Sequence, residues 1–435
     1  MFWEKEIELL PRDGLKALQL ERLAQTAAQA GRAPFYRKVF AEQRLSPESV
    51  RTLDDLRRFP FTTKEDLRAA FPYGFLAVPR EEVTRVHVSS GTTGIPTAVY
   101  HTRKDLETWA DLVARCLFMA GVRKADVFQN CMGYGLFTGG LGLHYGAERL
   151  GALVVPAGVG NSRRQITLMR QFGATAVHII PSYALKLLET FREMDLEPKK
   201  DTKLRVAIVG AEPHSEEIRG RIEEAYGVFA ANSYGLSEMN GPGVAFDCPY
   251  KTGLHLWEDS YILELVHPTT LEPLRDGEVG EIVLTTLRRE AMPLIRYRTR
   301  DLAMIYPDSC PCGRTHRRLS RIKGRSDDMF IIKGVNIYPI QIEQVLMRFA
   351  EVGNNYVIVL DREGPQDRVT VQIEASEALM VEGLESLKAL TRKITHALRE
   401  EILVTPEVEL VEPGSLPAAE GKAVRVIDHR PKQGD

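Results

Sequence analysis

The sequence has few cysteines, no excess of charge of either sign and no long apolar run. Only five of its 435 residues are cysteine, which argues against a disulfide-stabilised scaffold. The 57 basic and 59 acidic residues leave a net charge of −2, so the chain as a whole is not drawn to nucleic acid or to an anionic membrane. The longest uncharged stretch, VFQNCMGYGLFTGGLGLHYGA, contains glycines and polar residues that suit a pocket wall better than a membrane span. The N-terminal MFWEKEIELL does not resemble a secretory signal, so we expect a cytoplasmic protein with a small-molecule ligand and neither a nucleic-acid nor a membrane partner.

The pattern along the chain predicts an α/β protein of two domains. Short β-rich runs alternate with helical segments from about 125 to 235, which indicates a mostly parallel sheet covered by helices. Tight turns join the β-rich runs between 255 and 310, which predicts an antiparallel β-rich subdomain packed beside that sheet. The polar run GRSDD then separates two β-rich flanks. We therefore predict a large domain over 1–326 and a small α+β domain over 327–435.

Small hydroxylated residues and glycines dominate the stretch HVSSGTTGIPTAV at 87–99. The alternating run VTRVHV ends there, which predicts a strand that leads into a loop. Such a loop offers backbone N–H groups and hydroxyls to a phosphate, although a solvated turn explains the same residues. No lysine follows the loop, and Thr97 stands after Pro96 instead, which argues against a P-loop kinase or ATPase.

Two further loops, the GRSDD region and the C-terminal tail carry residues that suit a nucleotide site. They occur in NSYGLSEMNGPG, YRTRDLA, KGRSDDMFIIKGVNIYP and LPAAEGKAVRV. Each has a simpler explanation when taken alone. Glu238 suits a helix cap, and Lys422 suits a solvated surface. Asp301 suits a salt bridge to Arg298 or Arg300.

Taken together, these motifs resemble the adenylate-forming superfamily, and closely the phenylacetate–coenzyme A ligase family. SSGTTGIPT, YGLSE, YRTRD, GRSDDM and EGK occur in that family's order and approximate spacing, and the resemblance runs from LPRDGLKALQLERL to the tail. It implies the adenylate-forming enzyme fold with a small, mobile C-terminal domain, and a ligase that uses ATP, Mg²⁺ and coenzyme A. The implied product is an acyl adenylate that becomes a coenzyme A thioester, with release of AMP and pyrophosphate.

The same resemblance implies where the nucleotide binds. The Ser-Thr-Gly loop would wrap the β- and γ-phosphates, and Glu238 would bind Mg²⁺. Asp301 would accept hydrogen bonds from the ribose hydroxyls, with Arg325 beside it. Lys422 would be the main catalytic residue, because its ammonium stabilises the charge that gathers on the α-phosphate during attack. The full set of nucleotide residues is Ser90, Gly91, Thr92, Thr93, Gly94, Gly210, Ala211, Glu212, Pro213, Ser233, Tyr234, Gly235, Ser237, Asp301 and Arg325.

The second step needs a different surface, because the coenzyme A thiol must reach the adenylate carbonyl. In the family the small domain rotates to provide this surface. The resemblance implies a hinge at Asp327 and places Gly334 of IKGVNIYP near the pantetheine arm.

The acid pocket is predicted in MGYGLFTGGLG, where Tyr134 and Phe137 stand among glycines that include Gly139. Such a mixture suits a flat slot with aromatic walls, although either ring alone is explained equally well as ordinary core. The family resemblance makes an arylacetic acid such as phenylacetate the leading candidate, and it leaves benzoate-like and indole-containing acids open.

Cysteine and histidine side chains form a set suited to zinc. Cys248 and His255 in DCPYKTGLH and Cys310 and Cys312 in SCPCG match a structural tetrahedral Zn²⁺ site in ligand type and number. His316 is an alternative to His255. Reduced, unpaired cysteines explain the same residues equally well.

Two other functions stay open beside the ligase. One is the same adenylation chemistry with transfer to the thiol of a carrier protein. The other is a non-catalytic nucleotide-binding protein on the same fold, against which the presence of Glu238, Asp301 and Lys422 argues. We name a homodimer as the candidate assembly, without a sequence feature that supports it.

Overall fold

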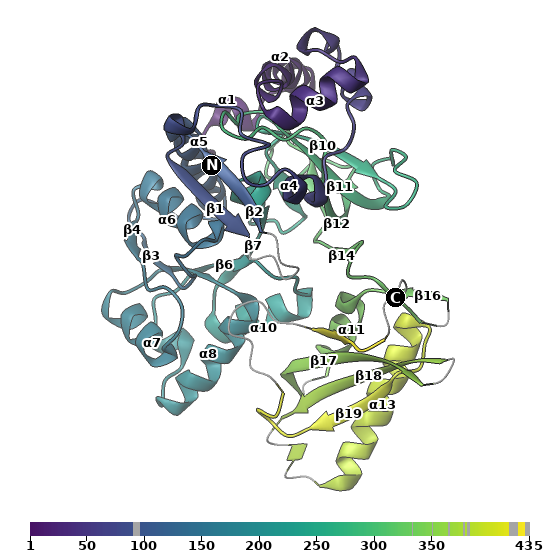
Figure 1. The fold of residues 1–435 in the computed structure, drawn as a ribbon. Helices are drawn as coiled ribbons and strands as arrows, with labels where there is room; N and C mark the ends of the chain where they lie inside the picture. The colour runs from purple at the N-terminus through teal and green to yellow at the C-terminus, as the bar shows by residue number, and fades with distance from the viewer. Residues whose placement is uncertain are drawn as a thin grey trace.

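Five neighbouring parallel strands, in the order β4-β3-β5-β6-β7, form one half of a twelve-stranded sheet (Figure 1). Side chains alternate between its faces: Val206 and Ile208 of β6 face the core that contains α5 and α6, whereas Ala207 and Val209 face the core of α7, α8 and α10. The predicted strand and helix alternation is confirmed. These elements are β3 (Val127–Asn130), α6 (Thr138–Leu150), β4 (Leu153–Val155), α7 (Ser162–Gln171), β5 (Ala176–Ile179), α8 (Pro181–Glu193), α9 (Pro198–Asp201), β6 (Val206–Gly210), α10 (Glu216–Tyr226) and β7 (Phe229–Leu236).

The antiparallel strands continue the same sheet. Strand β8 pairs with β7, and the hydrogen-bonded path runs on through β9, β13, β12 and β11 to β10, with β14 paired to β12. The predicted β-rich unit therefore exists but is continuous with the parallel sheet, because the chain turns back after β7 and pairs directly with it. Its elements are η4 (Ser237–Met239), β8 (Gly241–Asp247), β9 (Leu254–Leu256), β10 (Tyr261–Val266), β11 (Val279–Thr286), β12 (Tyr297–Tyr306), β13 (Arg318–Leu319) and β14 (Gly324–Arg325).

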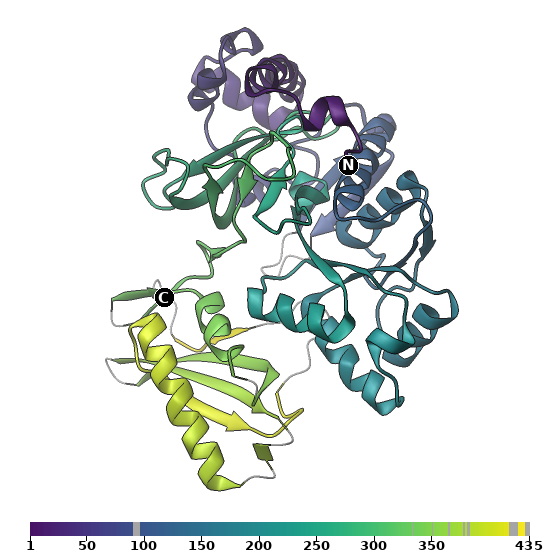
Figure 2. The same ribbon diagram turned by 180° about the vertical axis from the view of Figure 1, so that it is seen from behind.

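The N-terminal helices cover the antiparallel end of the sheet, as Figures 1 and 2 show. Helix α2 buries Leu15, Gln19 and Leu23 on one face, and the Gln19 amide donates to the backbone oxygens of Glu258 and Tyr261. The N-terminal helices are thus held on the sheet by both apolar and polar contacts. The elements of this region are α1 (Lys5–Glu8), α2 (Arg12–Ala30), α3 (Pro34–Gln43), η1 (Pro47–Ser49), η2 (Leu53–Arg58), α4 (Lys64–Ala69), η3 (Arg80–Glu82), β1 (Arg85–Ser89), β2 (Thr97–His101) and α5 (Arg103–Met119).

A second lobe follows β14 and contains a sheet of its own, with the strand order β19-β18-β17-β20. Helix α13 packs on this sheet through Leu390, Ile394 and Leu398, which recur at every fourth position. The predicted domain boundary, between residues 326 and 327, lies between β14 and β15. The elements of this lobe are β15 (Phe330–Ile332), β16 (Val335–Ile337), α11 (Pro339–Leu346), β17 (Val352–Glu363), β18 (Gln366–Ala375), α13 (Leu384–Ile402), β19 (Glu407–Val411) and β20 (Val426–Asp428).

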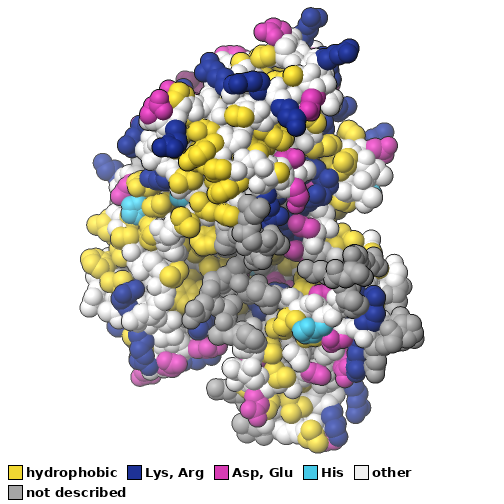
Figure 3. All heavy atoms as spheres, viewed as in Figure 1, with side chains coloured by type: hydrophobic (Ala, Val, Ile, Leu, Met, Phe, Trp, Pro, Cys, Tyr) yellow, Lys and Arg dark blue, Asp and Glu magenta, His cyan; other side chains and the backbone are white. Residues whose placement is uncertain are grey.

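The structure is a computed structural model. None of the helices it describes has both the length and the apolar character needed to cross a bilayer. The face drawn in Figure 3 carries basic and acidic side chains intermixed, in keeping with the balanced composition. The described residues are 1–89, 96–332, 334–349, 351–363, 366–376, 379–380, 383–416 and 425–430.

Candidate active site between the two lobes

A cavity of about 2940 Å³ lies where β6 and β7 end and the second lobe begins. Ligands of parallel sheets bind at the carboxyl ends of the strands, and most of the predicted site residues meet here. The predicted residues that line this cavity are Phe137, Gly139, Ala211, Glu212, Pro213, Ser233, Tyr234, Gly235, Ser237, Glu238, Asp301, Arg325 and Asp327.

The predicted phosphate loop lies at the tip of a β-hairpin. Strands β1 and β2 are antiparallel, and Ser89 pairs with Thr97 as the last pair before the loop. Ser89 and Pro96 both line the cavity, so the hairpin ends at its rim. The predicted loop residues 90–94 themselves, and the predicted catalytic Lys422, lie outside the described residues.

Asp301 of β12 is the centre of a buried polar group. It accepts a hydrogen bond from the Tyr234 hydroxyl at 2.7 Å and one from Arg325 Nη1 at 3.1 Å. Burial and the Asp301 charge raise the pKa of Tyr234 well above its usual value, so its hydroxyl remains a donor at neutral pH. A carboxylate oxygen can accept more than one hydrogen bond, and the group lines the cavity. This arrangement suits the binding of paired ligand hydroxyls.

The simple explanation offered for Asp301, a salt bridge to Arg298 or Arg300, is wrong. Both arginines pair instead with Glu281 of the neighbouring strand β11, at 2.8 Å and 3.8 Å. Alternate residues of a strand point to opposite faces. Arg298 and Arg300 therefore face Glu281, whereas Asp301 faces Tyr234 and Arg325.

Glu238 lies in η4 at the cavity wall and is only 5% exposed. Its Oε1 atom is 3.7 Å from Nζ of Lys64, and Tyr297 lies beside the same carboxylate. Burial and the Glu238 charge raise the pKa of Tyr297 well above its usual value. A carboxylate held in this way at the cavity wall fits the donor set of Mg²⁺, which takes one or two carboxylates together with phosphate oxygens.

Our sequence analysis missed both partners of Glu238. Tyr297 is the first residue of the YRTRD motif, and its place in that motif could have marked it as a site residue. Lys64 lies far upstream in α4, where no motif surrounds it. Only the fold brings α4 to the edge of the cavity.

The predicted acid pocket is assembled in part. Phe137, with 52% of its surface exposed, and Gly139 line the cavity, but Tyr134 lies beside it and is not among the lining residues. The Tyr134 hydroxyl accepts a hydrogen bond from Asn130 Nδ2 at 2.9 Å and lies 3.2 Å from His144 Nδ1. Tyr134 therefore supports the wall of the pocket from behind.

Two other predicted nucleotide and coenzyme A positions do not line the cavity. Gly210 ends β6, where an added Cβ would lie 2.3 Å from Ser233 Oγ, so glycine lets β6 and β7 approach each other closely. Gly334 has a φ of 82° and open space around it, between β15 and β16.

Four predicted metal ligands come together on the sheet. The ligand atoms of Cys248, His255, Cys310 and Cys312 all lie within 4.8 Å of one another, and three of the four residues are buried. Cys312 Sγ is 3.3 Å from His255 Nε2, and the Nδ1 atom of His255 is buried without a hydrogen-bond partner. The set fits zinc in ligand type, and its span of up to 4.8 Å is somewhat wider than the roughly 4 Å between the ligands of a tetrahedral Zn–thiolate site.

His316 does not belong to this set. Its Nδ1 accepts a hydrogen bond from the Glu258 backbone, and its Nε2 lies 3.1 Å from the oxygen of Ile7. Of the two histidines considered, His255 is the one that the fold places with the cysteines.

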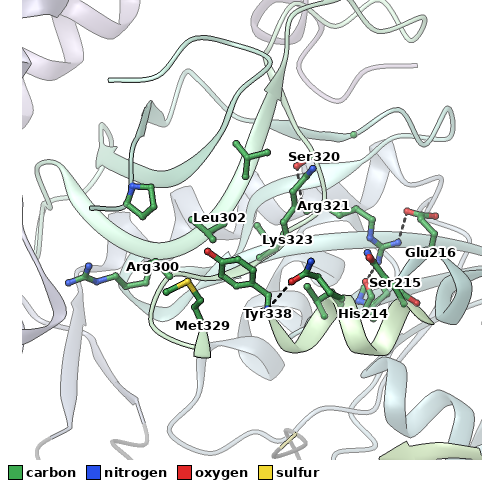
Figure 4. A pocket seen from close by; sticks show the side chains of 18 of the residues that line it. His214, Ser215, Glu216, Arg300, Leu302, Ser320, Arg321, Lys323, Met329 and Tyr338 are labelled. Atoms are coloured by element: carbon green, nitrogen blue, oxygen red, sulfur yellow. Dashed lines mark hydrogen bonds and ion pairs between the residues drawn. The ribbon is translucent and has the colours of Figure 1, made fainter. Parts of the chain in front are cut away.

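A second hollow of about 970 Å³ lies between the beginning of α10, strand β12 and helix α11. Figure 4 shows the side chains that surround it, with Arg321 directed toward Glu216, to which it forms an ion pair at 2.5 Å. Arg300 and Lys323 add positive charge, and Tyr338 lies beside them. Among the predicted site residues that the structure describes, Asp327 alone lines both this hollow and the larger cavity.

Comparison with known proteins agrees with this geometry. Residues 37–287 match the AMP-binding enzyme family, and residues 334–430 match the AMP-binding enzyme C-terminal domain. The chain is 47% identical to the phenylacetate–coenzyme A ligase of Thermus thermophilus, over 99% of this chain and 100% of that protein.

A solved ligase has the same fold over nearly the whole chain. The crystal structure of 2-hydroxyisobutyryl-CoA ligase in the post-adenylation state, in complex with R3-HIB-AMP, is 33% identical and superposes with a TM-score of 0.93, covering 99% of this chain and 92% of that one. The structure of that ligase in the thioesterification state, with 2-HIB-AMP and CoA, gives a TM-score of 0.73 at 34% identity, over 98% and 92% of the two chains.

The fold is therefore the predicted adenylate-forming one, and the match extends through both lobes. The enzyme is an ATP-dependent acid–thiol ligase that joins a carboxylic acid to coenzyme A through an acyl adenylate. The chain belongs to the AMP-binding enzymes and, within them, to the phenylacetate–coenzyme A ligase family.

Proposed function

We propose that the acid is an arylacetic acid, with phenylacetate as the first candidate. The observation that carries this proposal is the 47% identity to a phenylacetate–coenzyme A ligase along the whole chain. The exposed ring of Phe137 at the cavity wall supports it, because an aromatic face suits an aromatic acid. Phenylacetate and ATP would give phenylacetyl adenylate and pyrophosphate, and coenzyme A would then displace AMP.

An acid-dependent AMP-release assay tests this proposal. The enzyme receives ATP, Mg²⁺ and coenzyme A with phenylacetate, benzoate, indoleacetate or a medium-chain fatty acid, and both AMP and thioester are measured. We expect phenylacetate to give the highest kcat/KM. A higher value for benzoate or a fatty acid would contradict the proposal, and AMP without thioester would indicate a carrier-protein acceptor.

The described side chains support a separate role for each group of residues around the nucleotide. Asp301, with Tyr234 and Arg325, would hold the two ribose hydroxyls, and the 211–213 loop with Tyr234 would border the adenine. Glu238 would hold Mg²⁺, which when bound offsets the negative charge of the phosphates. Lys422 would stabilise the α-phosphate in the transition state of the first step, as the family resemblance implies.

The two lobes would change their relative orientation between the steps. The chain matches the post-adenylation structure of a related ligase at a TM-score of 0.93 and its thioesterification structure at 0.73, which supports two arrangements of the same lobes. Asp327 is exposed, follows β14 and pairs with Arg325 at 2.8 Å. We place the hinge there, because a residue at the end of an element absorbs backbone rotation readily.

A structural zinc ion is the second proposal. Cys248, His255, Cys310 and Cys312 would bind it through three sulfurs and His255 Nε2. Such a closed set leaves no open position for substrate, so the ion would join the β12–β13 connection to β8 and β9. Metal analysis of chelator-washed protein tests this: about one equivalent of zinc is expected, and a metal-free protein with unchanged stability would contradict it.

A further inference from the structure

Two polar contacts join helix α10 of the larger lobe to helix α11 of the smaller lobe. The backbone N–H of Ser215, which caps α10, donates to Glu343 Oε1 at 3.1 Å. Nη2 of Arg221, in α10, donates to the backbone oxygens of Met347 and Phe349 at 2.9 Å and 3.0 Å. These two acceptors directly follow the end of α11.

Each contact is suited to the helix end that it meets. The first N–H groups of a helix lack partners within the helix, and Glu343 supplies an acceptor oxygen to one of them at the start of α10. The last carbonyls of a helix favour a positive charge, which Arg221 supplies to α11. Each helix thus carries a side chain that hydrogen-bonds to unpaired backbone groups at the end of the other helix. Both contacts therefore require the same relative placement of the two helices.

Glu343 is deeply buried at this boundary, with 4% of its surface exposed. Its second oxygen accepts a hydrogen bond from the Tyr356 hydroxyl of β17 at 3.0 Å. One oxygen thus accepts from its own lobe, and the other accepts from the larger lobe. The charged groups that face it are Arg425, from the segment before β20, and Glu212, from the loop after β6. A buried carboxylate is costly unless it is hydrogen-bonded, and here half of its hydrogen bonding comes from across the boundary.

The contacts lie between the larger cavity, which Arg221 lines, and the second hollow. Ser215 and Tyr338 both line this hollow, and Figure 4 shows the two side chains on its wall. Neither Arg221 nor Glu343 touches Asp301 or Glu238 in the hydrogen bonds and ion pairs of the described residues. A change at these contacts therefore leaves the direct hydrogen bonds of Asp301 and Glu238 in place.

We propose that Arg221 and Glu343 are positioning residues that hold the lobes in the arrangement shared with the post-adenylation structure, on the adenylation side of the cycle, and release them for the coenzyme A step. We call Ser215, Arg221, Glu343 and the carbonyls of Met347 and Phe349 the α10–α11 clamp. The inference rests on the lobe movement proposed above. When the smaller lobe turns, both contacts break together, because α11 moves with that lobe and α10 does not.

Hydrogen exchange on the full-length enzyme tests the clamp without any substrate. The variant Arg221→Gln retains Glu343, which accepts the hydrogen bond from the Ser215 N–H. If Arg221 acted only on its own two acceptors, hydrogen exchange at Ser215 would therefore be unchanged. If the clamp acts as one unit, exchange at Ser215 accelerates by about tenfold, the cost of one hydrogen bond to a charged group. The control is Arg149→Gln, which removes an exposed arginine of α6 that pairs only with the same lobe. Unchanged exchange at Ser215 in Arg221→Gln would overturn the proposal.

The half-reactions give a second, independent readout. In Glu343→Ala, phenylacetate-dependent ATP–pyrophosphate exchange is expected to fall by about tenfold, while thioester formation from synthetic phenylacetyl adenylate and coenzyme A is retained or increases. The control is Glu400→Ala, an exposed residue of α13 in the same lobe. Equal loss in both half-reactions at an unchanged melting temperature would overturn the clamp. Absence of exchange in the unmodified enzyme with every acid would contradict the proposed function, and hydrogen exchange would still decide the clamp.

Discussion

The Asp301 group and the α10–α11 clamp are both buried polar networks, but they are built differently. Asp301, Tyr234 and Arg325 all belong to the twelve-stranded sheet, and the backbone pairing of β12 with β14 already places Asp301 beside Arg325. Ser215 and Glu343 belong to different lobes and meet only when the lobes adopt this arrangement. A network within one sheet survives a lobe rotation, whereas a network between lobes does not. The first suits a ligand that is held through both steps, and the second suits a change between them.

The largest effect is expected at Lys422, which should matter in one step only. Lys422→Ala should reduce ATP–pyrophosphate exchange by about a thousandfold, because a positioned cation stabilises the transition state more than the ground state. Thioester formation from synthetic adenylate should be unchanged. Unchanged adenylation would show that another residue has this role.

Asp301→Asn should weaken both steps, since the ribose is bound in each. We expect kcat/KM for ATP and for the adenylate to fall by about a hundredfold, because hydrogen bonds to a charged acceptor are lost at two donors. Asp276→Asn, an exposed residue whose ion pair with Arg317 is 3.9 Å long, is the matched control. A loss confined to one half-reaction would contradict the role of the Asp301 group in both steps.

The zinc set lies within the larger lobe. Its loss should lower the stability of the fold without changing the ratio of the rates of adenylation and thioester formation. Cys248→Ser, or zinc removal with a strong chelator, should lower the melting temperature by about 5 °C, which corresponds to roughly 2 kcal/mol. The ratio of the two half-reaction rates, measured well below the melting temperature, should remain the same. A changed ratio would mean that the cluster acts on the lobes.

The clamp should weaken as the pH rises. Burial raises the pKa of Glu343 from 4.5 to about 7, so its protonated form favours the clamped arrangement. That contribution is fully present below the pKa of the free carboxyl and is lost as the pH rises through about 7. Between about pH 6 and about pH 8, the ratio of thioester formation to adenylation should therefore rise by about tenfold. Glu343→Gln, which stays neutral, should flatten this dependence; the same slope in the variant would exclude Glu343 as its source.

The smallest effect is expected at Tyr134, which supports the cavity wall from behind. Tyr134→Phe removes the hydroxyl bonded to Asn130, and it should change the KM for the acid by less than about twofold because no ligand contact is lost. Phe137→Ala, at the lining itself, is the comparison and should raise that KM clearly. A large effect of Tyr134→Phe on this KM would indicate that the Tyr134 hydroxyl contacts the acid directly.

Much of the fold was predictable because its signals are local. The alternation of β-rich runs and helices over 125–235 indicated parallel strands, and each of them lies in the sheet as expected. The continuation of that sheet through β8 to β10 was missed, because strand pairing joins residues far apart in the chain and leaves no local pattern. The predicted homodimer, the hinge at Asp327 and the roles of loop 90–94 stay predictions.

The sequence by itself determined the family, the order of the motifs and the residue types that a nucleotide site requires, since these depend on short stretches with fixed spacing. Only the tertiary structure decided which side chains meet. It paired Asp301 with Arg325 and Tyr234, placed His255 with the cysteines, brought Lys64 to Glu238 and set Glu343 against the end of α10. Each of these contacts joins elements distant in the chain, and their geometry follows from how sheet and lobes pack together, which no single stretch of residues contains.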